Sequence, residues 1–463
     1  MERLQFVARL REIVGDKAVL EGDAVSSRYS GYFMEKIESQ LMVRPSTTEQ
    51  VSALLKLCND IGQTVVTQGG MSGWVRATQT KPDDLILSME RMNCIEEIDT
   101  VNRTASVQAG VILQNLQETL EEHDLIFPLD LGGRGSCQIG GNAATNAGGV
   151  RVIRYGMMRA LVLGLEAVMA DGTVISSMNK MLKNNSGYDI KQLFLGSEGT
   201  LGVITRLVLR LFERPCSENA ALVALNDFDS VARFLRFMDS RLGGKLSAFE
   251  VIDACFYKIN TAPGRHKAPI GGDYPYFVIT EALGFDTETD AAQFEQVLFA
   301  AMEEGLVADA VIPKSESERE SIWQLREDLE HVVSDLKPFQ AFDVSMPIGD
   351  METYMQRVTS EVKTVWPEGK LCFLGHVGDG NLHIAVGCGS SELGATRQVE
   401  HCVYRPLTGI GGSISAEHGI GLEKKDFLAL SRGPEELELM HLLKRNMDPN
   451  SILNPGKIFD LLS

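Results

Sequence analysis

Short apolar runs separated by polar, helix-like stretches predict that the chain opens with alternating strands and helices. Residues 41–43 are apolar and stop at Pro45, which predicts a strand that ends there. Oxygen-bearing side chains at 46–50 precede an apolar helical face that begins at Val51, so a capped helix should follow. The β-rich run 64–67 then ends in two glycines. The pattern therefore predicts a strand–helix–strand unit.

The same periodicities predict further elements along the chain. We expect helices at 7–14 and 112–123, and strands at 85–87, 105–109, 161–169, 174–175 and 207–211. Residues 371–386 should form a β-hairpin. The last residues, 454–459, should form a turn followed by a short strand.

The character of the chain changes near Arg214 and Pro215. Glycine clusters disappear there, and helical patterns alternate with short strands through about residue 370. Because domain boundaries fall where composition shifts, we expect a first domain over 1–213 and a second that begins at 214.

The charge balance narrows the function. The chain has 463 residues, with 44 Lys and Arg against 63 Asp and Glu, which gives a net charge of −19. A nucleic-acid-binding protein needs a basic surface, so this class is disfavoured. Docking to anionic lipid by charge alone is disfavoured for the same reason. An anionic substrate would have to be captured by a local positive group, such as a metal or an arginine.

The cysteines and the apolar runs indicate the compartment. None of the eight cysteines forms a C-x-x-C pair, so neither a disulfide framework nor a cysteine-rich zinc site is expected. No stretch reaches the roughly 18 apolar residues of a membrane helix, and no signal-peptide pattern begins the chain. We therefore predict a cytoplasmic protein, and a mitochondrial matrix enzyme with a trimmed transit peptide stays open.

Two glycine-rich loops, at 68–73 and 139–149, indicate a cofactor. Backbone N–H groups can approach phosphate closely where no Cβ intervenes. Neither loop is a phosphate-binding P-loop, and Gln138 stands where a dinucleotide fingerprint beginning at Gly133 needs its third glycine. One such loop alone would favour tight turns between strands. Two within 80 residues, with Asn and Thr interleaved, favour a diphosphate-containing cofactor.

The ordered motifs resemble FAD-binding proteins of the vanillyl-alcohol oxidase and para-cresol methylhydroxylase (PCMH) type. The motifs are Val-Arg-Pro at 43–45, Gly-Gly-x-Ser-Gly at 69–73, Phe-Pro-Leu-Asp at 127–130, the loop 136–149, Gly-Ser-Glu-Gly-Thr-Leu-Gly at 196–202, and Asn-Pro-Gly-Lys at 454–457. The resemblance implies an α+β fold with a two-part FAD-binding domain over 1–213. It also implies a cap with a ferredoxin-like sheet over 214–415, and a C-terminal segment, 416–463, that returns to the first domain.

The resemblance also implies which residues contact FAD. They are Pro45, Gly69, Gly70, Ser72, Gly73, Pro128, Cys137, Gly140, Gly141, Asn142, Thr145, Asn146, Gly148, Gly149, Glu198, Gly199, Gly202, Ile204 and Asn454. Some members of the family hold FAD covalently through a histidine near the first loop. Residues 68–76 contain no histidine, so we predict non-covalent FAD. Trp74 and Arg76 depart from the smaller residues usual in that loop.

Histidines form a second constellation. His376 and His383 flank a Gly-Asp-Gly turn, and across a hairpin the two imidazoles can meet. Glu417 and His418 follow in a glycine-flanked loop. Two histidines and a carboxylate can make a catalytic metal site with an open position. Either histidine alone would favour a structural interpretation.

These two motifs narrow the resemblance to D-lactate, D-2-hydroxyglutarate and glycolate dehydrogenases. The branch implies a divalent metal, usually zinc, on His376, His383 and Glu417, although manganese or iron would suit the same ligands. It implies that His418 is the general base and that Arg326 binds the substrate carboxylate. Such an enzyme would oxidise a D-2-hydroxy acid to the 2-oxo acid and pass hydride to flavin.

The chain departs from the D-2-hydroxyglutarate pattern at two positions. Relatives with that substrate carry a lysine where this chain has Ala341, and a threonine where it has Glu330. A distal carboxylate would lose a cationic partner, so we expect a monocarboxylate such as D-lactate or D-2-hydroxybutyrate. Lys337 could compensate.

Other functions and partners stay open at this stage. The alternative function is an accessory or non-redox protein of the same fold, such as a glycolate oxidase partner subunit or an alkylglycerone-phosphate synthase. A binding protein without turnover is a third hypothesis. No nicotinamide fingerprint is present, so the acceptor should be an electron-transfer flavoprotein or a quinone. A homodimer is the commonest quaternary structure and is the default expectation.

Overall fold

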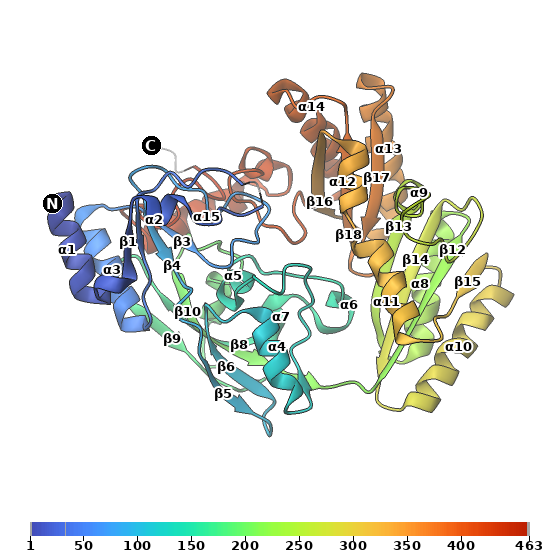
Figure 1. Cartoon of the computed structure of the whole chain (residues 1–463), viewed down its shortest axis with the longest axis horizontal. Helices are drawn as coiled ribbons and strands as arrows, with labels where there is room; N and C mark the ends of the chain where they lie inside the picture. Colours follow the sequence, from blue (N-terminus) through green and yellow to red (C-terminus); the bar gives the residue numbers. More distant parts are fainter. Residues whose placement is uncertain (1, 33, 461–463) are drawn as a thin grey trace. The chain divides into compact units, whose positions relative to one another are not determined.

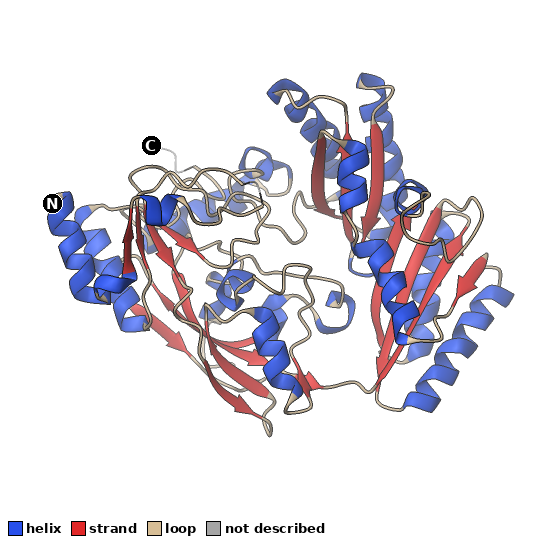
Figure 2. Ribbon diagram, in the orientation of Figure 1, coloured by secondary structure: helices blue, strands red, loops and turns tan. Residues whose placement is uncertain are grey.

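The computed structural model describes residues 2–32 and 34–460, and divides into two compact units (Figure 1). The first unit comprises the chain up to 148, then 156–214, and then 417 onward. The second comprises 149–155 and 215–416. Both units combine sheets with helices (Figure 2), so the expected α+β class is confirmed.

The first unit opens with the predicted strand–helix–strand arrangement. Its first sheet has the order β1-β2-β4-β3, in which β2 and β3 both run parallel to β4. The helix α3 begins because the Thr47 side chain accepts a hydrogen bond from the Gln50 N–H, and ends at Gly62 in the left-handed conformation. The bounds are α1 (Arg3–Val14), β1 (Val19–Glu21), α2 (Asp23–Ser26), β2 (Leu41–Val43), α3 (Thr48–Ile61), β3 (Val65–Gln68) and β4 (Leu85–Ser88).

The second sheet of this unit is antiparallel, with the order β5-β6-β10-β8-β9. The sequence did not predict β5, because this edge strand has only two apolar residues, Ile95 and Ile98, beside three acidic ones, and none of its residues is buried. The bounds are β5 (Ile95–Asp99), β6 (Thr104–Gln108), α4 (Leu113–Glu121), β7 (Leu125–Ile126), α5 (Ile139–Ala144), α7 (Met158–Leu161), β8 (Val162–Val168), β9 (Val174–Ser177), β10 (Val203–Arg210) and β11 (Phe212–Glu213).

The C-terminal segment belongs to the first unit and contains the helix α15 (Pro434–Met447). Lys444 is buried there, and its ammonium donates to the Asp448 carboxylate and to the carbonyls of Thr200 and Leu453. The prediction of a short strand after the turn in 454–459 is wrong. The strand-like pairing precedes the turn instead, as a parallel bridge between Leu453 and Val65.

The second unit is built on a seven-stranded antiparallel sheet, in the order β15-β12-β14-β13-β17-β18-β16. Its first four strands and the helices α8 and α10 follow the strand–helix–strand–strand–helix–strand order of a ferredoxin-like fold. The bounds are β12 (Ser217–Leu225), α8 (Phe228–Leu242), β13 (Leu246–Asp253), α9 (Ala254–Asn260), β14 (Tyr276–Gly284), α10 (Thr287–Glu303) and β15 (Asp309–Val311).

The predicted hairpin extends this sheet. The strands β17 and β18 pair antiparallel, and β16 adds to the outer edge of β18. The remaining bounds are α6 (Val152–Tyr155), α11 (Glu316–Glu327), α12 (Glu330–Leu336), β16 (Phe339–Ser345), α13 (Met351–Val365), β17 (Lys370–Gly375), β18 (Asn381–Gly387) and α14 (Leu393–Tyr404). Across the part of the chain that is described, no helix is both long and apolar enough for a bilayer crossing.

Candidate active site

The second unit brings two of the predicted histidines together. His376 follows β17 directly, and His383 lies within β18, so the hairpin turn presents both rings. Their ring centroids are 5.3 Å apart and the planes are nearly perpendicular. Gly375 is required at this point, because a Cβ would lie 2.4 Å from the Asn381 carbonyl oxygen. The hairpin thus places two potential metal ligands side by side.

A buried carboxylate, Glu250 of β13, lies behind His376. Its Oε1 is 2.5 Å from Nδ1 of His376, and its Oε2 accepts a hydrogen bond of 2.8 Å from Nε of Arg326. Burial would raise the pKa of Glu250, but the charges and hydrogen bonds of His376 and Arg326 outweigh it and lower the pKa to about 2. One carboxylate therefore fixes both a predicted metal ligand and the predicted substrate-binding arginine.

A second buried carboxylate, Asp343 of β16, lies opposite His383 in the sheet register. Its Oδ1 is 3.8 Å from Nδ1 of His383 and accepts a hydrogen bond from the Asn381 amide. Its Oδ2 accepts from the Ala416 N–H at 3.1 Å. Each histidine of the pair therefore has a carboxylate on its Nδ1 side, an arrangement that orients metal-binding imidazoles.

The sequence motifs point to neither Glu250 nor Asp343. One signal was available for Glu250, because it is the single charged residue inside the otherwise uncharged run 246–252. A charged side chain that faces the interior needs a partner. The partners of Glu250 are Arg326 and His376, which lie 76 and 126 positions further along the chain, so only the fold reveals them.

Glu417 and His418 begin the segment that returns to the first unit. The loop that carries them is held by Glu198, whose carboxylate accepts from the N–H groups of Ile420 and Gly421 at 2.6 and 2.8 Å. Burial raises the pKa of Glu198 above its ordinary value. Glu198 was predicted as a cofactor contact, and its side chain here positions the loop of the predicted general base.

Trp74, which departs from the family pattern, lies against His418. The two rings stack with centroids 5.6 Å apart, and Tyr32 stacks on Trp74 at 4.0 Å. Aromatic stacking of this kind restricts the imidazole to a narrow range of orientations. Both aromatic residues and His418 belong to the first unit.

The two glycine loops of the first unit pack closely against their surroundings. A Cβ on Gly70 would lie 1.9 Å from the Ser136 carbonyl oxygen, and one on Gly140 would lie 2.5 Å from the Cβ of Ala109. By contrast, a Cβ on Gly73 or Gly141 would meet no atom within 4 Å. The glycines therefore serve two purposes, since some permit backbone contact and others leave space for a bound group.

Unpaired polar atoms support a ligand at these loops. Within the described chain, the Gln138 Oε1 and the Thr67 Oγ1 are buried and lack a hydrogen-bond partner. Buried polar atoms usually have partners. Gln138 lies 3.4 Å from the Cβ position of Gly69, between the two loops. The Thr67 hydroxyl could donate to a phosphate oxygen, whereas the Gln138 oxygen can only accept, from a hydroxyl or N–H group of a polar cofactor such as FAD.

Asn454 joins three distant parts of the first unit. Its Oδ1 accepts from the Thr67 N–H at 2.9 Å, and its Nδ2 donates to the Glu198 carbonyl at 2.6 Å. Gly199, the next residue, has a φ of +71° and a Cβ position 2.8 Å from that amide. The predicted cofactor residues Glu198, Gly199 and Asn454 are thus brought together.

The other predicted cofactor residues are distributed as follows. Cys137, Asn142, Thr145 and Asn146 lie in or beside α5, where Asn142 donates to the Cys137 sulfur. Gly149 starts the short segment 149–155, which packs within the second unit although the sequence assigned it to the first domain. Pro45, Pro128 and Ile204 are buried in the first unit.

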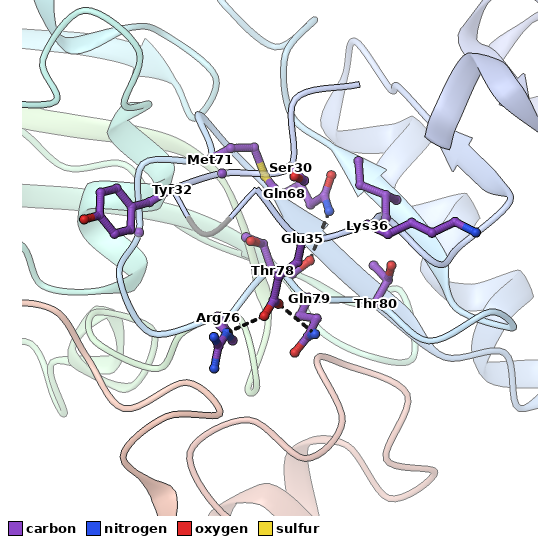
Figure 3. A pocket seen from close by; sticks show the side chains of 13 residues that line it. Ser30, Tyr32, Glu35, Lys36, Gln68, Met71, Arg76, Thr78, Gln79 and Thr80 are labelled. Atoms are coloured by element: carbon purple, nitrogen blue, oxygen red, sulfur yellow. Dashed lines mark hydrogen bonds and ion pairs between the residues drawn. The ribbon is translucent and has the colours of Figure 1, made fainter. Parts of the chain in front are cut away.

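A polar pocket adjoins the first glycine loop (Figure 3). Gln68, Met71 and Gly73 line it together with residues of the segment 30–37. Arg76 pairs with Glu35 at 3.0 Å inside this pocket, and also with Glu423. The unusual arginine of the loop is therefore held in place by two carboxylates of the first unit.

Comparison with known proteins identifies the family. The family described as "FAD binding domain" matches residues 39–177, and that described as "FAD linked oxidases, C-terminal domain" matches residues 214–458. The chain belongs to the FAD-linked oxidases. The PCMH-type resemblance of its motifs is confirmed.

Three similar proteins show which subgroup of the family the chain belongs to. A protein named probable D-2-hydroxyglutarate dehydrogenase, mitochondrial, of Oryza sativa subsp. indica is 38% identical over 458 residues, which cover 98% of this chain and 81% of that protein. A D-2-hydroxyglutarate dehydrogenase of Xanthomonas citri pv. viticola is 37% identical, over 90% of this chain and 88% of its own. A putative mitochondrial D-lactate dehydrogenase of Schizosaccharomyces pombe is 36% identical, over 91% and 82%. Within the family, the chain belongs to the FAD-dependent D-2-hydroxy acid dehydrogenases.

Solved structures agree on the fold. A p-cresol methylhydroxylase has a TM-score of 0.78 at 18% identity, covering 99% of this chain and 97% of that one. An alkyldihydroxyacetonephosphate synthase has a TM-score of 0.76 at 16% identity, covering 98% and 85%. At these identities the likeness extends to the fold alone, and the synthase gains no support as an alternative function.

Proposed function

We propose that the chain oxidises a D-2-hydroxy monocarboxylic acid with FAD and a divalent metal, and that zinc is the metal. The observation that carries this proposal is the chain of contacts from Arg326 through Glu250 to His376. In this chain of contacts one buried carboxylate holds both the guanidinium proposed to bind the substrate and the imidazole proposed to bind the metal.

His376, His383 and Glu417 would hold the metal. Glu250 occupies Nδ1 of His376, which leaves Nε2 as the proposed ligand atom of that ring, at 3.5 Å from a terminal nitrogen of Arg326. Nδ1 of His383 is 3.8 Å from Asp343, which is too long for a hydrogen bond. Glu417 is bonded to Ala416, whose N–H donates to Asp343, the partner of His383. Since consecutive Cα atoms are about 3.8 Å apart, this hydrogen bond tethers Glu417 near the histidine pair. Three such ligands leave an open position for substrate.

Each residue has a separate role in the proposed reaction. Arg326 binds the substrate carboxylate with its planar guanidinium. His418 takes the proton of the substrate hydroxyl on a ring nitrogen, and Trp74 keeps its imidazole in place. When bound, the metal would supply a Lewis acid to the substrate hydroxyl oxygen, and FAD would supply the hydride acceptor.

The proposed preference for monocarboxylates rests on Ala341. Residues two apart along a strand share a face, so Ala341 lies on the same face of β16 as Asp343, and Ala385 opposite it lies on the face of His383. A lysine at 341 would place an ammonium close to the histidine pair. Alanine cannot pair with a second carboxylate, and the acidic Glu330 at the start of α12 adds no positive charge.

The remaining assignments extend the same proposal. We infer that the first unit is the FAD-binding domain and the second the substrate domain, and that residues 69–73, 136–149, 198–204 and Asn454 hold FAD without a covalent bond. Gln138 offers a further polar contact through its unpartnered oxygen. An electron-transfer flavoprotein or a quinone is the proposed acceptor, a homodimer the proposed assembly, and the cytoplasm or the mitochondrial matrix the proposed location.

Metal depletion tests the proposal. Turnover of D-lactate with an artificial electron acceptor should stop after treatment with EDTA and return with zinc, manganese or iron. His376→Ala and Glu417→Gln should keep FAD but lose at least about 100-fold in kcat/KM, whereas the exposed His123→Ala should behave like wild type. Full activity in protein shown to be free of metal would refute the metal's role.

A further inference from the structure

A second group of potential metal ligands lies away from the histidine pair, entirely within the second unit. It consists of His266, in the loop after α9, Asp328, between α11 and α12, and His331, in the first turn of α12. One ligand atom from each residue can be chosen so that all three lie within 4.8 Å of one another. His266 and His331 are 65 positions apart, so no short motif links them.

The distances fit a metal ion. Nε2 of His266 is 2.8 Å from Oδ2 of Asp328, and Nε2 of His331 is 3.5 Å from the same oxygen. Ligand atoms about 2.0–2.1 Å from a tetrahedral zinc are about 3.3 Å apart. The two histidine–carboxylate distances therefore differ from this spacing by about half an ångström or less.

The protein holds the carboxylate ready for such a role. Oδ1 of Asp328 accepts from the Glu330 N–H at 3.1 Å, which directs Oδ2 to the two histidines. Burial would raise the pKa of Asp328, but the hydrogen bonds from His266 and Glu330 lower it overall. The side chains are about one-quarter to one-third exposed, so an ion can reach them from solvent.

The surrounding backbone makes the group rigid. Asn260 is fully buried, and its amide donates to the carbonyls of both Leu325 and Asp328, which fastens the end of α11. Arg265, next to His266, forms two hydrogen bonds with Asp335 of α12. The three ligands are thus carried by segments that are already joined, which lowers the cost of ordering them around an ion.

We propose that His266, Asp328 and His331 form a second site for a zinc-class divalent ion. Two imidazoles and one carboxylate match the preference of zinc and its neighbours, with water in the fourth position. Arg326 lies two residues before Asp328, at the end of α11 (Figure 1). An ion here fixes the α11–α12 junction and thereby the arginine that faces Glu250.

Metal counting in the full-length protein tests the proposal. Protein stripped with EDTA, loaded with zinc and passed through a desalting column should retain two zinc ions per chain. His331→Ala and His376→Ala should each retain one, and the double variant none. His123→Ala, an exposed histidine in the first unit, should retain two.

A second variant and a second measurement distinguish loss of the metal site from misfolding of the protein. Asp328→Asn keeps an oxygen for the Glu330 N–H but removes the anionic ligand, and it should also retain one ion. Zinc should raise the Tm of His376→Ala, which has only the second site, but not that of the double variant.

The outcomes separate the two proposals. One zinc per chain that persists in His331→Ala and Asp328→Asn would overturn the second site. One zinc that is lost in those variants but kept in His376→Ala would support the second site and remove the metal from the proposed mechanism.

Discussion

Glu250 Oε1 lies 2.5 Å from Nδ1 of His376, while Glu250 Oε2 lies 2.8 Å from Nε of Arg326. A single buried carboxylate therefore supports a predicted metal ligand and a predicted substrate ligand at once. The relationship makes the positions of these two groups interdependent, because neither can move without losing a charge-assisted hydrogen bond.

Removal of the Glu250 charge should weaken both metal binding and substrate binding. Glu250→Gln should lower metal affinity and kcat by about 10–100-fold each and should raise KM for the 2-hydroxy acid. Metal analysis and steady-state kinetics measure these changes. Glu166→Gln is the matched control, because Glu166 is also buried and hydrogen-bonded, to Thr48 and Thr205. Equal changes in metal affinity, kcat and KM in Glu250→Gln and Glu166→Gln would indicate that Glu250 only stabilises the fold.

Trp74 should act through His418. Trp74→Ala removes a stacking partner, and a contact of about 0.5–1.5 kcal/mol corresponds to a loss of about 2–10-fold in kcat. Trp74→Phe should retain most of the activity. The pH dependence of kcat should change in the alanine variant, because the imidazole loses an apolar neighbour. An unchanged pH profile together with a lower Tm would indicate that Trp74 only stabilises the fold.

Asn454 should be needed for FAD retention. Asn454→Ala leaves the Thr67 N–H and the Glu198 carbonyl without their partner, at a cost of about 2–4 kcal/mol in unfolding free energy. The flavin-to-protein absorbance ratio and Tm should both fall. Asn450→Ala is the control, since Asn450 is exposed and bonds only to Asn59. Full FAD content in Asn454→Ala would contradict its place at the cofactor.

Asp253 predicts a pH dependence of stability. Burial raises its pKa to about 7, so the folded protein binds a proton there between about pH 4 and pH 7 that the unfolded chain has released. The contribution to stability is complete below about pH 4 and is lost as the pH rises through 7. It amounts to about 4 kcal/mol at most, because some solvent reaches the side chain.

Asp253→Asn should flatten this part of the stability curve, since asparagine can still cap α9 through the Phe256 N–H. Asp227 caps α8 in the same way, but hydrogen bonds from Ser230 lower its pKa. Asp227→Asn should therefore remove stability above pH 4 and change little at lower pH. Thermal unfolding between pH 4 and pH 8 distinguishes the two signs.

Much of the fold could be predicted because local signals are strong in this chain. The helix α3 was predicted from its oxygen-bearing capping side chains and its apolar face, and Thr47 is the cap in the structure. The strand β5 was missed because an exposed edge strand needs few apolar residues. The terminal strand was predicted wrongly because Leu453 pairs with a distant strand before the turn.

The predicted ligands came from sequence motifs, but their supports did not. His376 and His383 lie seven positions apart around a turn, so a hairpin brings them together. Glu250 and Asp343 are isolated carboxylates in apolar strands, and their partners depend on how the sheet is assembled. Local patterns carry no information about such pairings.

The most direct test is an anaerobic titration of the purified protein with D-lactate and L-lactate, followed by the absorbance of the oxidised flavin. The D-acid alone should bleach this band, and prior treatment with EDTA should prevent the bleaching until metal is restored. A flavin band that neither D-lactate nor another D-2-hydroxy acid bleaches in metal-loaded protein would contradict the proposed reaction and leave only the fold in place.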